Sequence, residues 1–321
     1  MSSQNEALAL ARKYQKKTDK EHILDNPDTY TGSMEQIANE LHVLNPDEER
    51  VSSREINYIP GLYKLFDEAI VNCHDHAIRT SIQERSNTHF PVTSIEVTIR
   101  DDGTMVFYND GNGIDVTEHP EHKIWIPEMI FAHLRTGTNY DKSEKKIVGG
   151  KNGFGAKLIF IWSEYGELET IDYTRGKRFV QTYHNNLSTI SKPKITNTKK
   201  KPYTKITFKP DYKRLGIDGL TPDLIALFKK RVYDIAAVTA KSVKVKLNGV
   251  LIPVRTFPAY MDMYIGSKSD AKRVYEAPHP RWEYAVSLTP TDEFRHISFV
   301  NGIYTSKGGK HVEYILNQIV R

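Results

Sequence analysis

Glu68 and Asn72 lie four residues apart in a segment whose apolar residues recur at helical spacing. Side chains at this separation project from the same face of a helix, one turn apart. An amide oxygen is a hard ligand that suits Mg²⁺, and a carboxylate can accept a proton from a water molecule that attacks a phosphate. The pair is therefore a candidate metal and general-base site, although the exposed face of an ordinary amphipathic helix explains the same residues.

The segment from Gly149 to Lys157 has the sequence Gly-Gly-Lys-Asn-Gly-Phe-Gly-Ala-Lys and leads into an apolar helical pattern. Glycine-rich backbone can wrap around an anion, and the free amide groups at a helix start favour phosphate. The order of residues matches neither a P-loop nor the dinucleotide-binding fingerprint. We predict that this segment binds phosphate. A flexible connector is the alternative, but connectors seldom lead directly into an apolar helix with lysines at both ends.

Three further groups of residues are ambiguous. The segment Asn109-Asp110-Gly111-Asn112-Gly113 follows a predicted strand, and its glycines permit crowded backbone near a ligand, but a hairpin turn explains it equally. Thr136 to Asn139 offers hydroxyl and amide groups for a phosphate or a ribose, or forms an ordinary turn after a helix. His74 and His76 are two apart on a helix and point in different directions, so they cannot share a metal. We interpret both as surface or packing residues.

Composition excludes several classes of protein. The 321 residues are 39% hydrophobic and 26% charged, an ordinary globular balance. No apolar run approaches the roughly 20 residues of a transmembrane helix, and the first residues lack the apolar core of a secretory signal. The single cysteine, Cys73, excludes an internal disulfide and a zinc site built on several thiolates. These features predict an intracellular protein.

The positive charge of the chain is modest and unevenly placed. Lys plus Arg is 45 and Asp plus Glu is 40, so the net charge is 45 − 40 = +5. Six lysines and no acid lie between Ser191 and Lys205, and a second basic stretch runs from Thr305 to His311. Nucleic-acid binding requires lysines on one surface that displace counterions from phosphates. Either stretch could contact DNA, but a solvated loop is the commoner explanation of the first.

The helices and strands that the sequence predicts must hold these candidate side chains in place. A long helix begins at Pro60-Gly61, and Thr221-Pro222-Asp223 begins another that extends to about residue 240. The other predicted elements are strands at 94–100, 104–108, 167–173, 179–183 and 205–208, and helices at 127–134 and from 156 onward. Residues 1 to about 30 are polar, which predicts an arm rather than a core element. The mixture predicts an α+β sandwich, with helices on one face of a mixed sheet, and a smaller α/β unit after a boundary near residues 248 to 256.

In chain order, Glu68-x-x-x-Asn72, Asn109-Asp110-Gly111-x-Gly113 and the loop from Gly150 to Lys157 resemble the motifs of the GHKL ATPase superfamily. The similarity is closest to one branch, eukaryotic-type DNA topoisomerase II, and it runs in register from about residue 14 to the last residue. The segments that carry it are Tyr14-Gln15-Lys16-Lys17-Thr18, Glu21-His22-Ile23-Leu24, Pro27-Asp28-Thr29-Tyr30, Pro60-Gly61-Leu62-Tyr63-Lys64, Ile126-Pro127-Glu128-Met129-Ile130-Phe131, Thr138-Asn139-Tyr140-Asp141 and Ser298-Phe299-Val300-Asn301-Gly302.

The resemblance implies a Bergerat-type GHKL α/β sandwich followed by a partial transducer domain with a right-handed β-α-β crossover. Residues 1–30 would form an N-terminal arm, residues 31–250 the ATPase domain and residues 251–321 the first part of the transducer. The implied function is the ATP-binding and ATP-hydrolysing gate of a type II DNA topoisomerase. In such an enzyme ATP-driven dimer closure serves the passage of one DNA duplex through another, which changes DNA topology.

The resemblance also implies cofactors, partners and a location. ATP and Mg²⁺ would be the cofactors. Double-stranded DNA and a second copy of the chain would be the partners, with the two copies joined through the arm and the ATPase domain and with no membrane involved. The location would be the nucleus for a cellular protein, or the viral factory, the virion or the host cell for a viral one.

Individual roles follow from the resemblance residue by residue. Glu68 falls at the water-activating base, Asn72 at the Mg²⁺ ligand and Asn109 at the adenine-side position. Tyr14, in the arm, falls where the family contacts the nucleotide held by the partner subunit. The nucleotide-contacting triplet falls on Gly137, Thr138 and Asn139, and the phosphate loop falls on Gly150, Lys151, Asn152, Gly153, Phe154, Gly155, Ala156 and Lys157.

The sequence departs from the family pattern at four of these positions. The family triplet is Ser-Ser-Asn, so glycine at 137 loses a hydroxyl contact and threonine at 138 retains one. Lys151 replaces the usual arginine and Phe154 the usual tyrosine, which keeps the charge and the ring but loses the guanidinium fork and the phenol hydroxyl. The family's switch lysine and DNA-cleaving tyrosine fall beyond Arg321. We therefore expect an N-terminal part of a longer enzyme, one that hydrolyses ATP weakly by itself.

Two alternatives belong to other functional classes. A GHKL chaperone or mismatch-repair clamp should lack both the Gly-Gly-Lys-His segment at 308–311 and the Tyr-Gln-Lys-Lys arm, and both are present here. A nucleotide-sensing DNA clamp whose hydrolysis has decayed would not be expected to retain Glu68. An ATPase assay with and without DNA separates these alternatives from the topoisomerase gate.

Overall fold

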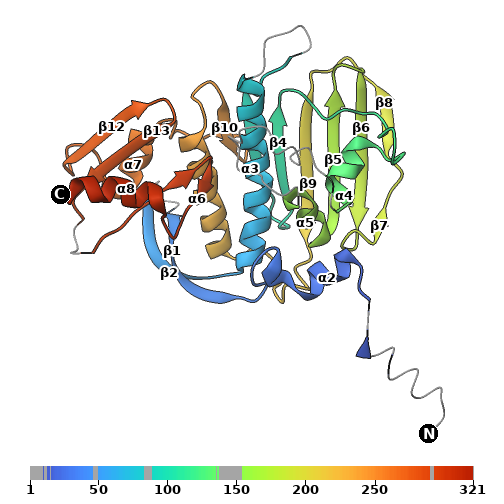
Figure 1. Cartoon of the computed structure of the whole chain (residues 1–321), viewed down its shortest axis with the longest axis horizontal. Helices are drawn as coiled ribbons and strands as arrows, with labels where there is room; N and C mark the ends of the chain where they lie inside the picture. Colours follow the sequence, from blue (N-terminus) through green and yellow to red (C-terminus); the bar gives the residue numbers. More distant parts are fainter. Residues whose placement is uncertain are drawn as a thin grey trace.

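The largest element of the structure is a nine-stranded sheet (Figure 1). The structure is a computed structural model that describes residues 10, 13–14, 16–45, 50–82, 89–134, 136, 154–289 and 293–320. The strand order is β11 (Val250–Leu251), β10 (Lys244–Leu247), β3 (Ser94–Ile99), β4 (Met105–Asp110), β9 (Tyr203–Pro210), β5 (Ser163–Asp172), β6 (Lys177–His184) and β7 (Thr189–Ile190), with β8 (Lys194–Asn197) also paired to β6. Neighbouring strands are antiparallel except β3 and β10, which are parallel. The predicted mixed sheet is confirmed.

Helices α3 (Pro60–Ile82), α4 (Ile126–Ala132) and α5 (Gly155–Ile161) lie on one face of this sheet, and α6 (Pro222–Val238) lies beside α3 (Figure 1). Apolar side chains at helical spacing turn one face of α3 toward the sheet. The ring of Phe66 stacks on Phe228 of α6, with 4.3 Å between centroids, and meets Phe107 of β4 at 5.1 Å. Aromatic contacts of this kind add to the stabilisation from burial alone. Helix α3 is thereby fixed between α6 and the sheet.

The N-terminal segment contains more structure than its polar composition predicts. Helix α2 (Asp19–Asp25) begins with a capping box in which the side chains of Thr18 and Glu21 bond to each other's backbone amides. A short 3₁₀ turn, η1 (Pro27–Thr29), and the hairpin β1 (Ile37–Asn45) and β2 (Arg50–Tyr58) follow. Ile23 is fully buried in the main core. The prediction that residues 1 to about 30 lack a core element is therefore wrong at α2.

The segment after residue 250 forms α7 (Phe257–Ile265), the hairpin β12 (Arg273–His279) and β13 (Trp282–Ser287), the hairpin β14 (Phe299–Val300) and β15 (Ile303–Tyr304), and α8 (Lys310–Ile319). These elements gather at the end of the molecule that carries the C-terminus (Figure 1). The buried core does not divide at the expected boundary, because Ile252, Val254, Tyr260 and Met263 belong to the same apolar cluster as α3.

None of the helices in the described ranges combines the length and apolar character needed to cross a membrane.

Candidate functional site

Glu68 and Asn72 lie on the same face of α3, as predicted, and both are partly buried. The Glu68 side chain is 23% exposed, and its Oε1 forms an ion pair with Nζ of Lys64 at 2.7 Å. Among the residues that the structure describes, none forms a hydrogen bond or ion pair with the Asn72 side chain. In these ranges no protein group therefore competes for the amide oxygen of Asn72, a type of oxygen that can bind Mg²⁺.

The glycine-rich segment meets Glu68 at its last glycine. Gly155 is the first residue of α5, and a methyl group in its place would lie 1.7 Å from Oε2 of Glu68. Only glycine permits this approach of the backbone to the carboxylate. The candidate base and the end of the predicted phosphate loop, 87 positions apart in the printed sequence (155 − 68), are thus brought into direct contact.

The neighbouring positions of the predicted loop have different surroundings. Phe154 and Ala156 are partly buried against the main core, and the ring of Phe154 lies 6.3 Å from that of Tyr30. Lys157 is 1% exposed, and its Nζ donates a hydrogen bond to the Thr136 carbonyl at 2.8 Å. Burial of the ammonium lowers the pKa of Lys157 to about 8. The other predicted contacts, Gly137, Thr138, Asn139, Gly150, Lys151, Asn152 and Gly153, lie outside the described residues.

Asn109 is the second-to-last residue of strand β4 and is 4% exposed. The loop that follows is attached to several elements. A methyl group at Gly113 would lie 1.9 Å from the Ile171 carbonyl, and the backbone amide of Ile114 donates to Oγ1 of Thr170 at 3.0 Å. On its other side, the Asn112 carbonyl lies 2.6 Å from Nε2 of His76. Because His76 follows Asn72 by one helical turn, this contact attaches the loop to α3 one turn beyond the candidate metal ligand.

The sequence assigned no role in this site to three residues that position it. Lys64 pairs with Glu68, Thr170 supports the β4 loop, and His76 joins that loop to α3. The four-residue spacing of Lys64 and Glu68 was a usable signal, since side chains at this separation meet on a helix. Thr170 and His76 act through tertiary contacts that no local spacing encodes.

Both His74 and His76 are packing residues, as expected, and burial lowers the pKa of His76 to about 4.

Tyr14 is 71% exposed, and in the described structure its ring meets only the ammonium of Lys13, at 5.5 Å. It makes no contact with Glu68, Asn72 or Asn109. Its expected role concerns a nucleotide in another subunit and stays a prediction.

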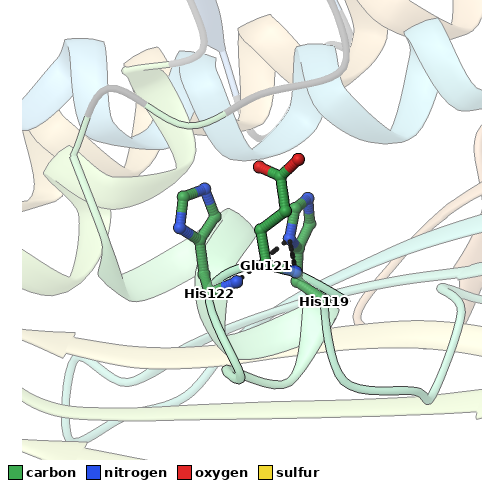
Figure 2. A group of neighbouring side chains, drawn as sticks. All are labelled: His119, Glu121 and His122. Carbon is green, nitrogen blue, oxygen red and sulfur yellow. Dashed lines mark hydrogen bonds between the residues drawn. The ribbon is translucent and has the colours of Figure 1, made fainter.

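A separate group of potential metal ligands, His119, Glu121 and His122, lies in the loop between β4 and α4 (Figure 2). Their ligand atoms lie within 4.8 Å of one another. The two imidazole rings are stacked, with 4.6 Å between centroids, so their in-plane nitrogen lone pairs do not converge. Two imidazoles also suit zinc-like ions better than Mg²⁺. This group is distinct from the oxygen donors on α3, and the His-x-Glu-His spacing was the sequence signal for it.

The two basic segments differ in structure. The first was expected to be a solvated loop, but it contains β8, which pairs with β6. Lys205, at its end, lies in β9 and forms ion pairs with Glu169 and Glu167. The lysines in between are exposed; they are Lys192, Lys194, Lys199, Lys200 and Lys201. In the second segment, Lys307 before α8 and Lys310 at its first position are exposed.

Comparisons with solved structures identify close relatives of this fold. The ATPase region of Saccharomyces cerevisiae topoisomerase II superimposes with a TM-score of 0.89 and 41% identity, over 97% of this chain and 80% of that one. The ATPase and transducer domains of DNA topoisomerase II from Balamuthia mandrillaris superimpose with a TM-score of 0.87 and 40% identity, over 96% of this chain and 76% of that one. The 43K ATPase domain of Thermus thermophilus gyrase B, 20% identical with a TM-score of 0.50 over 72% of this chain and 49% of that one, shares the fold alone.

Curated sequences agree with the structures. DNA topoisomerase 2 of Acanthamoeba polyphaga mimivirus is 46% identical over 97% of this chain and 24% of its own length. DNA topoisomerase 2 of Arabidopsis thaliana is 43% identical over 95% of this chain and 20% of its own length. The chain thus spans a quarter or less of these curated relatives. No protein-family model matches the sequence.

Proposed function

The chain belongs to the ATPase region of the DNA topoisomerase II family, and we propose that it is the ATP-binding and ATP-hydrolysing gate of a type II DNA topoisomerase. The observation that carries this proposal is the contact between Glu68 and Gly155. It sets a carboxylate against the backbone where the glycine-rich segment enters α5. A nucleotide whose terminal phosphate is held by that segment would present the phosphate to Glu68.

The roles of the individual residues follow from their chemistry. The Glu68 carboxylate would take the proton of the water molecule that attacks the terminal phosphate. The Asn72 amide oxygen, one helical turn away, fits Mg²⁺, which would offset the phosphate charge when bound. Asn109, buried at the end of β4, would contact the adenine side of the nucleotide, and the segment from Gly150 to Lys157 its phosphates.

We further propose that ATP binding closes two copies of this chain into a dimer around a DNA duplex, and that hydrolysis reopens it. The exposure of Tyr14 supports a role for the arm in contacting a second subunit. In such a gate, binding energy drives a conformational closure, so that hydrolysis and subunit movement are linked.

Isothermal titration calorimetry with a non-hydrolysable ATP analogue tests the nucleotide site. We expect the unaltered chain to bind the analogue more tightly in Mg²⁺ than in a chelator. Asn72→Ala should remove most of this difference, because the octahedral ion loses an oxygen ligand. Asn317→Ala, at an exposed position of α8, is the matched control and should bind like the unaltered chain. Absence of binding by the unaltered chain would contradict the proposal, and equal losses in Mg²⁺ and in chelator would remove Asn72 from the metal site.

A further inference from the structure

Lys64 lies between two carboxylates on α3. Its Nζ is 2.7 Å from Oε1 of Glu68 and 3.6 Å from Oδ2 of Asp67. Burial alone would lower the pKa of Lys64, but the two carboxylates outweigh burial and raise it. The ammonium is therefore charged and shared between the candidate base and its neighbour in the sequence.

Asp67 in turn is held by a second cation from α6. Nε of Arg231 donates to Oδ1 of Asp67 at 2.7 Å, and the Arg231 side chain is fully buried. Nη2 of Arg231 donates to the Gly302 carbonyl at 2.9 Å. A continuous series of polar contacts thus runs from Glu68 through Lys64, Asp67 and Arg231 to the turn between β14 and β15.

That turn is inserted between α3 and α6. Asn301 and Gly302 both have left-handed backbone, with φ of 50° and 77°. A methyl group at Gly302 would lie 2.5 Å from Cε1 of His74 on α3, while the Gly302 carbonyl faces Arg231 on α6. The strand that leaves the turn is also attached, because the ammonium of Lys230 lies 4.3 Å from the ring centroid of Tyr304.

The same local turn occurs elsewhere without these contacts. Asn248 and Gly249, between β10 and β11, have φ of 49° and 79°, and a methyl group at Gly249 would meet nothing within 4 Å. The two turns therefore differ in their surroundings rather than in their backbone. Only the β14–β15 turn is placed to influence the polar series that ends at Glu68.

We propose that Lys64 is a positioning residue for Glu68, and that the Asp67–Arg231 pair couples this positioning to the β14–β15 turn. The inference rests on the proposed role of Glu68 as general base. A shift of the turn moves its carbonyl relative to Arg231, which alters how Asp67 is held. Asp67 then competes differently for Lys64, and the Glu68 carboxylate changes its position relative to the attacking water. Displacements on the scale of 1 Å at a reacting group cost up to about 10²-fold in rate.

Steady-state ATP hydrolysis, measured over a range of ATP concentrations, tests the positioning role. Lys64→Met should lower the maximal rate by about tenfold, a moderate case of a misplaced reacting group, with little change in the ATP concentration that gives half of it. Lys64→Arg should restore most of the rate, because a cation again faces both carboxylates. Lys209→Met is the matched control, since Lys209 is similarly exposed and pairs with Glu164 at 3.1 Å outside this series. A Lys64→Met rate equal to that of the control would overturn the inference.

The coupling is tested by a double-substitution cycle. Gly302→Ala presses the turn against His74 and should lower the rate, whereas Gly249→Ala, at the same backbone conformation in open space, should not. Combining Gly302→Ala with Lys64→Met should cost less than the sum of the two single effects, because both act on one series. Additive effects would overturn the coupling. If Gly302→Ala lowers the unfolding temperature of the chain, the cycle is measured at a temperature at which circular dichroism shows all of the variants folded, and additive effects there would still overturn the coupling.

Glu68→Gln separates this inference from the proposed function. If Glu68→Gln hydrolyses ATP at the unaltered rate, the base assignment fails and the positioning role falls with it. If Glu68→Gln is inactive while Lys64→Met matches the Lys209→Met control, the base assignment stands and only the inference about Lys64 fails.

Discussion

Two groups of basic residues in this chain have opposite surroundings, one at the junction of α3, α5 and α6 and the other in and after β8. At the junction, Lys157, Lys230 and Arg231 are at most 2% exposed, and each donates a hydrogen bond to an oxygen of the fold. In the segment from Lys194 to Lys201, every lysine is exposed. A buried cation must be balanced by its neighbours, whereas an exposed one is screened by solvent. The formal net charge of +5 therefore does not locate the cations that act on the site.

Removing a buried cation should give the largest effect. Arg231→Met leaves Asp67 and Asp234 without their shared partner, and breaking a buried pair in this way costs about 3–5 kcal/mol. Arg54→Met removes a partner of Asp223 in a pair whose side chains are 43% and 30% exposed, and should cost less than about 1 kcal/mol. Urea unfolding of both variants measures the difference. Equal costs would show that burial does not decide how much the loss of a paired cation destabilises the chain.

An intermediate effect is expected from the ionisation of Lys157. With its pKa lowered to about 8, this side chain is mostly charged at pH 7 and mostly neutral at pH 9. If its ammonium contacts a phosphate, affinity for a non-hydrolysable ATP analogue should fall as the pH rises across this window, by up to about tenfold for a pKa near 8. Lys157→Met should bind more weakly at pH 7 and lose this pH dependence. A pH dependence that persists in Lys157→Met would assign it to another group.

The smallest effect is expected from the exposed lysines. We interpret Lys199, Lys200 and Lys201 as a solvated stretch rather than a DNA contact, so replacing them by glutamine should leave DNA affinity and its dependence on salt nearly unchanged. Each lysine that contacts a phosphate would instead contribute about one unit to the salt slope. Fluorescence anisotropy with a duplex at several salt concentrations measures this slope. A salt slope reduced by about three units in the triple variant would show that the segment contacts DNA. The exposed lysines would then also have a function, and burial would not separate functional from solvated cations.

Local patterns predicted the elements that carry the site. The spacing of Leu62, Leu65 and Phe66 predicted α3, and Thr221-Pro222 predicted the start of α6, where the Thr221 side chain caps the helix. Helix α2 was missed because Ile23 is its one buried residue. The other residues of this short helix are mostly polar, so its sequence does not show a face that packs on the core.

The connections within the site could not be predicted in the same way. Asp67 and Arg231 are 164 residues apart, and the spacing within either helix gives no sign that they meet. Gly155 was singled out from the sequence for the freedom of a phosphate-wrapping backbone. In the structure it leaves room for the Glu68 carboxylate, a steric reason that only the packing of α5 against α3 reveals.

The central claim is that the Glu68 carboxylate, set against Gly155, is the general base of an ATP-hydrolysing site. Phosphate release under single-turnover conditions, with the chain in excess over ATP, tests it most directly. We predict that Glu68→Gln binds the non-hydrolysable ATP analogue as the unaltered chain does but hydrolyses ATP more slowly by about 10²-fold or more. Hydrolysis by Glu68→Gln at the rate of the unaltered chain would contradict the account.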